Sequence, residues 1–522
     1  MPRIITGKIN ASARIIADIS SGIYRTPANA LKELVSNAWD ADAPEAVINT
    51  GYPRFELITC SDTGLGMTTN EFRRCMKHIG GSFKRIDRDT TPSGRPIIGK
   101  IGIGILAIAQ ICDKFSVFSS NGDSTRFEAQ IDLSEFREQK AYKTNIGNVR
   151  IGQFKCSEYR LAEDEKGKPH TRILLQKIDP GFHQRLLSAQ DPKMSVPDFR
   201  ARRKQPITFD QFLAYVNKKK GLNELSEYDN LLWGLSIATP IQYLDKGPFL
   251  YATSGKVDHI KKGLSDFKFR LVVDGMELRK PIVFPTSKDL RDISEDQKVY
   301  DNIDFDREVE GRRFKFRGYV FYQRRRIFPS ELQGVLIRIR NVAIGSYDRS
   351  LLGYPIARGP QMALLSSEIY VDSGLEDALN IDRNSFRETD SHFTTLQKEL
   401  FLKLNDIFTE IKSISRTRMR RVRRENEQIV LADLQRRIEE TTGLRFELEE
   451  SDEKSQFPLA LDLHRNVITI FWKHRIFPRN RAQRELLQRI LAYFEIANLE
   501  ATKESARERF YALLRSGITR AR

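Results

Sequence analysis

The strongest constraint on the fold of this 522-residue chain is the segment SDTGLGM (61–67), which directly follows the strand-like FELITC (55–60). Two glycines one residue apart let the backbone turn sharply and approach a neighbouring group closely. The segment therefore predicts a strand that ends in the carboxylate of Asp62, beside a tight turn. A carboxylate held there can accept a hydrogen bond from an exocyclic amine of a ligand. An ordinary β-turn is the alternative for this segment by itself.

A second glycine-rich segment, GKIGIGILAIAQI (99–111), runs into a sequence with the apolar content of a packed helix. Glycine-rich backbone that leads into a helix N-terminus presents N–H groups and a partial positive charge, which suit phosphate groups. The segment is not a Walker A loop, because no Gly-Lys-Ser/Thr follows, and no strand leads into it as a dinucleotide fingerprint requires. A close helix-packing interface is the alternative explanation for its small residues.

A helix is predicted over ELVSNAWDADA (33–43), ahead of both glycine segments. Glu33 and Asn37 are four residues apart and therefore lie on one face of this helix. An amide oxygen can ligate Mg²⁺, and a carboxylate can orient or deprotonate an attacking water. A solvated helix face is the common explanation for such a pair in isolation. Three motifs in this order, each in a suitable context, predict one site for a Mg²⁺-bound phosphate ligand.

Composition narrows the class of protein. Apolar residues make up 40% and charged residues 30% of the chain, which indicates a globular protein of several domains. No stretch reaches about 18 uninterrupted apolar residues and the first residues lack a signal-peptide pattern, so we expect a cytoplasmic protein without a membrane segment. Four cysteines without paired spacing argue against disulfides and zinc. The formal charge of +17 fits nucleic acid, acidic protein partners or solubility alone.

Four segments together resemble the successive motifs of the GHKL ATPase superfamily: ELVSNAWDADA, DTGLGM, HIGGSFK (78–84) and IGKIGIGILA (98–107). The superfamily includes gyrase, histidine kinases, MutL and the ninety-kilodalton heat-shock chaperone, and the resemblance is closest to the chaperone branch. It implies a Bergerat fold, in which helices are layered on a mixed sheet. It also implies ATP and Mg²⁺ as cofactors, ATP hydrolysis as the activity, and a mobile lid between Gly80 and Ile98.

The resemblance implies roles for individual residues. Glu33 would be the catalytic base, Asn37 the Mg²⁺ ligand, and Asp62 the carboxylate that binds adenine. The further nucleotide-binding residues that it implies are Asp40, Gly64, Gly66, Met67, Gly99, Lys100, Gly102, Gly104 and Thr171.

A downstream segment, ALNIDRNSFRETD (378–390), is similar to the catalytic loop of the chaperone's middle domain. This similarity implies that Arg383 reaches the γ-phosphate from a second domain, where a guanidinium neutralises charge that develops in phosphoryl transfer. Arg387 is a rival for the role. A surface arginine in a helix-capping loop is the plain alternative.

We expect an α/β (α+β) protein with four regions. They are an ATP-binding domain over 1–180, a helical linker over 181–244, an α/β transducer-like middle domain over 245–414, and a smaller mixed region over 415–522. Region 415–522 begins with a basic helix, and we expect it to mediate dimerisation or contact with a partner.

A run of arginines over residues 416–424 is a candidate contact for polyanions. Arginines on every side of a helix bind phosphate backbones by charge, without sequence specificity. A solvated linker helix paired with nearby acidic residues is the alternative. The arginines of this run are Arg416, Arg418, Arg420, Arg421, Arg423 and Arg424. Basic residues also cluster at 202–204 and at Lys218–Lys220. Arg324–Arg326 follow a predicted strand and are expected at an exposed edge or a domain interface.

The motifs predict an ATP-dependent conformational clamp of the chaperone type. In this interpretation ATP closes the lid, a homodimer forms, and Arg383 joins Glu33 for hydrolysis. The resemblance to compact chaperone relatives also points to a prokaryotic antiviral defence module. Two alternatives stay open: a DNA-binding clamp similar to MORC or MutL proteins, which the net charge favours, and a nucleotide sensor or scaffold that does not hydrolyse ATP.

Overall fold

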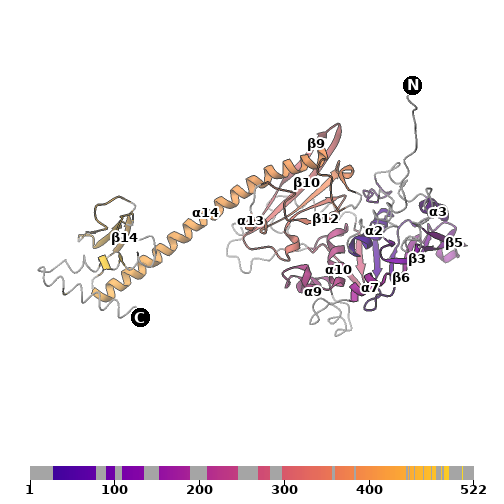
Figure 1. The fold of residues 1–522 in the computed structure, drawn as a ribbon, viewed down its shortest axis with the longest axis horizontal. Coiled ribbons are helices and arrows are strands. Elements are labelled where there is room, and N and C mark those ends of the chain that lie inside the picture. The colour runs from indigo at the N-terminus through magenta and orange to yellow at the C-terminus, as the bar shows by residue number, and fades with distance from the viewer. Residues whose placement is uncertain are drawn as a thin grey trace, which may run out of the picture. The chain divides into compact units, whose positions relative to one another are not determined.

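The computed structural model describes two compact units, residues 1–405 and 406–522 (Figure 1). Within the part of the chain whose placement is described, no helix is long and apolar enough to cross a bilayer. The described residues are 27–77, 90–99, 108–134, 152–187, 208–244, 268–281, 297–355, 359–380, 384–442 and shorter stretches between 445 and 508.

The N-terminal part of the first unit is built on an eight-stranded mixed sheet (Figure 1). Neighbouring strands are antiparallel except for β1 and β7, which are parallel. Strand β2 ends at Asp62, as the sequence predicts. In sheet order the strands are β5 (Gln153–Arg160), β4 (Thr125–Asp132), β3 (Cys112–Ser120), β6 (His170–Ile178), β2 (Ile58–Asp62), β1 (Glu45–Asn49), β7 (Arg270–Val273) and β8 (Met276–Leu278).

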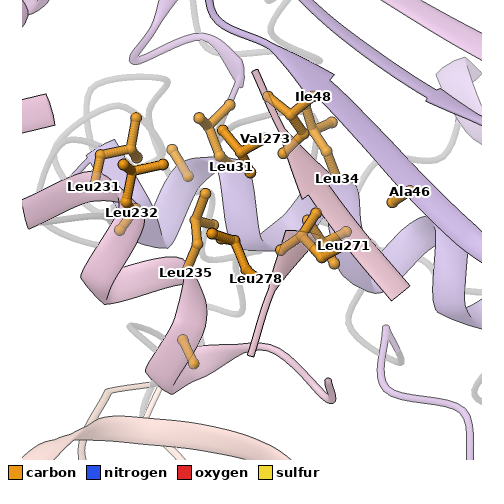
Figure 2. Packing of buried hydrophobic residues seen from close by; sticks show 14 of the residues in the cluster. Leu31, Leu34, Ala46, Ile48, Leu231, Leu232, Leu235, Leu271, Val273 and Leu278 are labelled. Carbon is orange, nitrogen blue, oxygen red and sulfur yellow. The ribbon is translucent and has the colours of Figure 1, made fainter. Parts of the chain in front are cut away.

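Helix α2 (Pro27–Asp40) packs its apolar side on this sheet. Leu31, Leu34, Val35 and Ala38 recur at helical spacing, and each is at most 2% exposed. Figure 2 shows Leu31 and Leu34 among apolar residues of β1 and β7. Burial of a leucine or valine side chain contributes about 1.5–3 kcal/mol, so this face fixes the position of the helix and leaves its other side for polar residues.

Helix α10 (Glu227–Ala238) packs against α2, and its Leu231, Leu232 and Leu235 belong to the same core (Figure 2). Gly234 makes this close approach possible, because a Cβ at that position would lie 2.6 Å from the Cβ of Ala28. The other helices of this part are α3 (Thr69–Lys77), α7 (Pro180–Leu187) and α9 (Phe209–Val216).

A five-stranded sheet follows in the first unit, with only β11 and β13 parallel. The short helix α13 (Gly359–Met362) precedes its strand β13. Helix α14 (Ser391–Thr442) starts after the sheet, with Asp390 accepting the N–H groups of His392 and Phe393. The strands in sheet order are β12 (Val342–Asp348), β11 (Gly334–Ile339), β13 (Leu365–Ser373), β10 (Arg312–Gln323) and β9 (Gln297–Val309).

A buried ion pair lies at the centre of this second sheet. Arg338 and Glu368 are both fully buried, with Nη2 and Oε1 2.5 Å apart. Glu368 also accepts hydrogen bonds from the hydroxyls of Tyr319 and Tyr243, and Tyr243 follows α10 in the chain. Removal of one partner of a buried ion pair typically costs about 3–5 kcal/mol. The pair therefore ties the second sheet to the layer of α10.

The second unit contains a three-stranded sheet in the order β14 (Glu447–Ser451), β16 (Val467–Phe471), β15 (Leu459–Asp462). Strands β14 and β16 are parallel, and β15 is antiparallel to β16. Ile468 and Ile470 of the central strand are fully buried and supply part of its core.

The predicted fold class is confirmed: the protein is α/β, with helices layered on a mixed N-terminal sheet, a second mixed sheet and a smaller C-terminal region. The domain limits remain a prediction. Strands β7 and β8 follow the linker in sequence, yet they extend the N-terminal sheet through parallel pairing of β7 with β1. This pairing buries Leu271 and Val273 in the core against α2.

Gly234→Ala tests the close packing of α10 on α2. Alanine stabilises a helix interior by about 1 kcal/mol relative to glycine. Overpacking against Ala28 costs about 1–3 kcal/mol, so we expect the free energy of unfolding to fall by about 1 kcal/mol. Denaturant unfolding measures the change. Ala28→Gly removes the opposing Cβ. In the double variant, we expect the loss in free energy of unfolding to be smaller than the sum of the losses in the two single variants. Strict additivity would contradict the proposed contact.

Candidate functional site

The polar side of α2 carries Asn29, Glu33 and Asn37 at four-residue intervals. Residues so spaced lie above one another on one helix face. Glu33 is only 5% exposed, whereas Asn37 is exposed. The predicted catalytic and Mg²⁺-binding residues therefore share one stripe, with the carboxylate sheltered and the amide open.

The last turn of α2 holds the start of the second glycine segment. Asp40 accepts the N–H of Ile98 at 2.8 Å through Oδ1 and the N–H of Gly99 at 2.9 Å through Oδ2. A Cβ at position 99 would lie 2.8 Å from Asp40 Oδ2 and 3.8 Å from Asn37 Oδ1. Because glycine has no such atom, this backbone approaches the helix at the turn that carries Asn37.

The first glycine segment contacts Ala41, the residue directly after α2. The N–H of Leu65 donates to the carbonyl oxygen of Ala41 at 2.7 Å, and a Cβ on Gly64 would lie 2.4 Å from the same oxygen. Gly66 has a φ of +61° and also leaves no room for a side chain, since its Cβ would lie 1.9 Å from the carbonyl oxygen of Ser120. Both glycine segments therefore converge on residues 40–41.

Asp62 stands at the end of β2 with its carboxylate partly enclosed. Its Oδ1 accepts the N–H of Gly64 at 3.0 Å. Burial raises the pKa of Asp62 to about 6, although the Gly64 hydrogen bond and the positive charge of His170 act in the opposite direction. An acceptor with this pKa is ionised at neutral pH but protonated in mildly acidic solution.

Met67 and Thr171 are brought together by a residue that sequence reasoning missed. Thr171 lies opposite Asp62 in the β2–β6 register. Ser119 of β3 bonds through its hydroxyl to Thr171 Oγ1 at 2.9 Å and accepts the N–H of Met67 at 3.0 Å. A single serine in a strand carries no sequence signal, so its role becomes visible only through the pairing of β3 with β6.

Four of the predicted site residues lie outside the described part of the chain: Lys100, Gly102, Gly104 and Arg383. For Arg383, the flanking residue Asn384 is described, and the side-chain amide of Asn29 donates to Asn384 Oδ1 at 3.4 Å. The flank of the predicted catalytic loop therefore reaches the polar stripe of α2. Of the expected lid, residues 90–98 are described.

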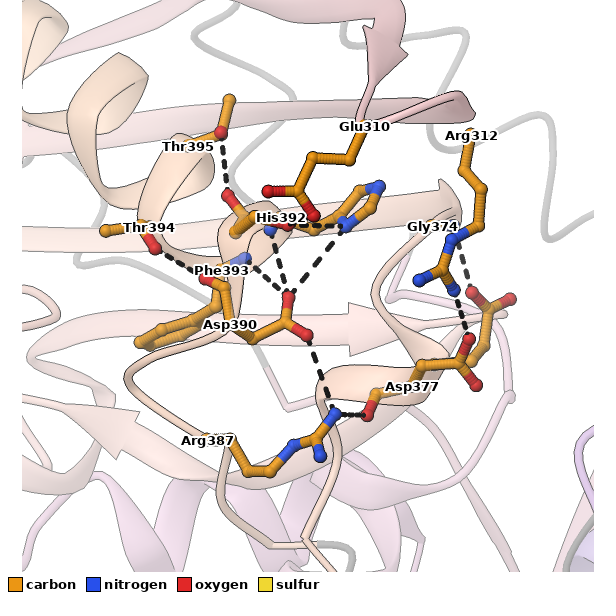
Figure 3. A network of polar contacts seen from close by, with 12 residues as sticks. Glu310, Arg312, Gly374, Asp377, Arg387, Asp390, His392, Phe393, Thr394 and Thr395 are labelled. Carbon is orange, nitrogen blue, oxygen red and sulfur yellow. Dashed lines mark hydrogen bonds and ion pairs between the residues drawn. The ribbon is translucent and has the colours of Figure 1, made fainter.

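Arg387, the rival of Arg383, lies in a network at the start of α14 (Figure 3). Its guanidinium donates to the carbonyl oxygen of Asp377 at 2.5 Å and lies 3.6 Å from the carboxylate of Asp390. Asp390 in turn accepts two N–H groups of the first turn of α14. In this structure Arg387 holds a helix-capping loop.

Segment 95–99, at the base of the expected lid, is held from both sides. On the α2 side, the Trp39 indole donates to the Pro96 carbonyl oxygen at 2.9 Å, and the Arg95 guanidinium lies 5.0 Å from the Trp39 ring centroid. On the other side, Arg340 donates to the carbonyl oxygen of Ile97 at 2.5 Å and pairs with Glu376 at 3.1 Å. Sequence reasoning missed Arg340, because a turn arginine has no periodic signal.

The described residues contain no group of three or more His, Cys, Asp or Glu arranged to hold a metal ion. A Mg²⁺ bound with a nucleotide does not require such a cage, since it takes one or two protein oxygens together with phosphates and water. The exposed amide of Asn37 beside Gly99 fits this requirement.

Comparisons with known proteins relate the N-terminal region to a family. Residues 24–161 match the family described as "Histidine kinase-, DNA gyrase B-, and HSP90-like ATPase". A protein named "Putative type II restriction enzyme HgiDII", from Herpetosiphon aurantiacus, is 38% identical over 112 residues, which are 22% of this chain and 18% of that protein. "Chaperone protein HtpG" of Clostridium acetobutylicum is 26% identical over 184 residues, or 32% of this chain and 26% of the chaperone.

The matched stretches thus cover less than a third of either relative's length. The family match, over residues 24–161, includes α2 and both glycine segments. A helix layered on a mixed sheet is the fold that the resemblance to this family implies. The N-terminal region of this chain is a GHKL ATPase domain, and it is homologous to the heat-shock chaperone HtpG.

Proposed function

We propose that this chain binds Mg-ATP at the end of α2, hydrolyses it, and uses the cycle to drive a conformational clamp of the chaperone type. The convergence of both glycine segments on residues 40–41 supports this proposal most directly. It brings Asp62, Asn37 and Gly99, whose predicted roles concern different parts of one nucleotide, to the same end of one helix.

Asp62 recognises adenine in this proposal. Its carboxylate accepts the exocyclic amine, and the Gly64 N–H fixes the carboxylate's orientation. Gly64 and Gly66 let the base approach the backbone, while Met67 and Thr171 complete this side of the site around Ser119. Selectivity for adenine follows because a base without an amine at this position would leave the Asp62 carboxylate without its donor, which costs about 1–3 kcal/mol of binding free energy.

Glu33 and Asn37 act on the phosphates. The Asn37 amide oxygen ligates Mg²⁺, which neutralises phosphate charge when bound. The Glu33 carboxylate, one turn earlier on the same face, orients water and accepts its proton. The backbone of Gly99 and the predicted contacts of Lys100, Gly102 and Gly104 hold the phosphates, and Arg383 reaches the γ-phosphate from its loop.

The clamp motion is proposed to pass through segment 95–99. This segment touches α2 through Asp40 and the second sheet through Arg340. A change in the lid on nucleotide binding would therefore reach both sheets. The proposal includes homodimerisation on ATP binding, a protein client and a role in a prokaryotic antiviral defence module. The similarity to a protein named as a restriction enzyme favours the role in defence.

A DNA-binding clamp of the MORC or MutL type is the second candidate. Arg416, Arg420 and Arg421 of α14 are exposed and Arg418 is half-buried, while the side chains of Arg423 and Arg424 lie outside the described residues. ATPase rates with and without DNA, together with the solution size in a non-hydrolysable ATP analogue, distinguish the two candidates. Stimulation by DNA favours the second, and dimerisation without any effect of DNA favours the first.

Glu33→Gln tests the catalytic base. General-base catalysis contributes about 10²–10⁴-fold, so we expect ATP turnover to fall at least 100-fold while ATP affinity stays within about threefold of the wild type. Turnover is followed by phosphate release and affinity by calorimetry. Unchanged turnover in Glu33→Gln would refute the assignment. A wild-type protein that binds ATP but does not hydrolyse it would instead support the sensor alternative.

Asp62 predicts the pH dependence of nucleotide affinity. The ionised carboxylate is a stronger hydrogen-bond acceptor than the protonated one, so protonation below a pKa of about 6 weakens the bond from the adenine amine. We expect constant affinity for ADP between pH 7 and 8 and a loss of affinity below pH 6, of at most about tenfold per pH unit. The phosphates of ADP titrate as well, so Asp62→Asn serves as the control. If wild type and variant show the same pH profile, the assigned role of Asp62 is wrong.

Arg340→Ala tests the link between the second sheet and the base of the lid. Loss of the contacts to Ile97 and Glu376 is expected to lower kcat about tenfold and to leave ADP affinity nearly unchanged, because the adenine contacts lie elsewhere. Arg312→Ala is the matched control, since Arg312 of β10 forms an exposed ion pair with Asp377. Equal kcat values for the two variants would remove Arg340 from the mechanism.

A further inference from the structure

Two basic clusters that are more than 100 residues apart in sequence lie side by side in the fold. The backbone N–H of Ser330 donates to the carbonyl oxygen of Lys220 at 3.2 Å. A Cβ on Gly221 would lie 3.4 Å from the hydroxyl of Ser330. The turn after α9, which carries Lys218–Lys220, therefore adjoins the segment that carries Arg324–Arg326.

The same junction adds a seventh cation and an aromatic ring. Arg349 donates to the hydroxyl of Ser330 at 2.8 Å. Phe328, between the arginines and Ser330, is 40% exposed. Lys218, Lys220, Arg349 and all three residues of Arg324–Arg326 are exposed. Arginine and aromatic side chains are enriched at interfaces, so this surface has the composition of a contact region.

Positive charge prevails in this surface, which comprises residues 217–221, 324–330 and Arg349. Residues 217–221 (NKKKG) and 324–330 (RRRIFPS) contain six basic and no acidic residues. Three neighbouring carboxylates are engaged in local structure: Glu224 accepts the N–H of Lys220, Glu331 accepts from Ser330, and Asp348 accepts from Ser350 and Leu352. With these three included, the surface keeps a net charge of +4.

The two clusters are close enough to contact one stretch of a nucleic-acid duplex. An extended chain spans at most about 3.6 Å per residue, so the Cα of Arg326 lies within about 14 Å of that of Ser330, which is bonded to Lys220. A duplex carries one phosphate per about 1.7 Å of axis, or about eight phosphates over that length. Arginine's planar fork matches phosphate oxygens in pairs. The two clusters can therefore face one stretch of backbone together.

We propose that residues 217–221, 324–330 and Arg349 form a binding surface for duplex DNA, which contacts the phosphate backbone and not the base edges. The surface belongs to the first unit, whereas the arginine run of α14 belongs to the second. It does not require ATP hydrolysis. DNA binding is therefore measured without nucleotide, and its outcome is independent of the outcome for the proposed ATPase.

The test is fluorescence anisotropy of a labelled duplex of about 20 base pairs across a salt series. Two triple variants each remove one cluster: R324Q/R325Q/R326Q and K218Q/K219Q/K220Q. Each phosphate contact contributes about 0.9 to the salt slope, so each variant is expected to lower the slope by about 2–3 and the affinity at low salt at least tenfold. R324K/R325K/R326K, which keeps the charge, is expected to retain most of the binding.

K155Q/K166Q/K168Q is the matched control, because it also removes three exposed charges, from the N-terminal sheet and its loops. We expect its salt slope to stay within about one of the wild type. An equal loss in this control, an unchanged slope in both cluster variants, or no binding by the wild type at low salt would each overturn the proposal. So would equal competition by polyglutamate at the same charge concentration, or a clear preference for single-stranded DNA.

Discussion

The last turn of α2 is the constraint on which the arrangement of the candidate site depends. Asp40 uses both carboxylate oxygens to hold the backbone of residues 98 and 99, and Ala41 accepts the N–H of Leu65. Hydrogen bonds to a charged acceptor contribute about 1.5–3 kcal/mol each. The helix itself is fixed by apolar residues at most 2% exposed, so the glycine segments are positioned against a rigid support.

The two faces of helix α2 have different roles: one packs in the core and the other carries the polar residues of the candidate site. The apolar face is buried on the sheet and under α10, where Gly234 permits contact with Ala28. The opposite stripe presents Asn29, Glu33 and Asn37. A substitution on the apolar face would shift the whole stripe, because interiors are closely packed and transmit displacement. Stability of the core and geometry of the site are therefore coupled through one element.

Polar contacts join the helices and loops around the N-terminal sheet to the second sheet and its loops, and they connect the site with the remainder of the first unit. Some are buried and polar, such as the Glu368 cluster with Tyr243. Others lie at the site, as with Arg340 on the Ile97 carbonyl oxygen and Asn29 on Asn384. A polar contact at a junction can be remade in a second arrangement more easily than a packed apolar one, which suits a region expected to move with nucleotide.

The sequence by itself determined the local features: the helix with Glu33 and Asn37 on one face, the strand that ends at Asp62, the turn glycines and the mixed fold class. These depend on helical and strand periodicity and on the conformational freedom of glycine, which short segments carry. Only the tertiary structure decided the contacts between distant segments. They include the pairing of β7 with β1, the roles of Ser119 and Arg340, and the meeting of Lys218–Lys220 with Arg324–Arg326. Contacts of this kind join residues as far apart in sequence as 52 and 243 positions. No local sequence pattern encodes which segments will meet.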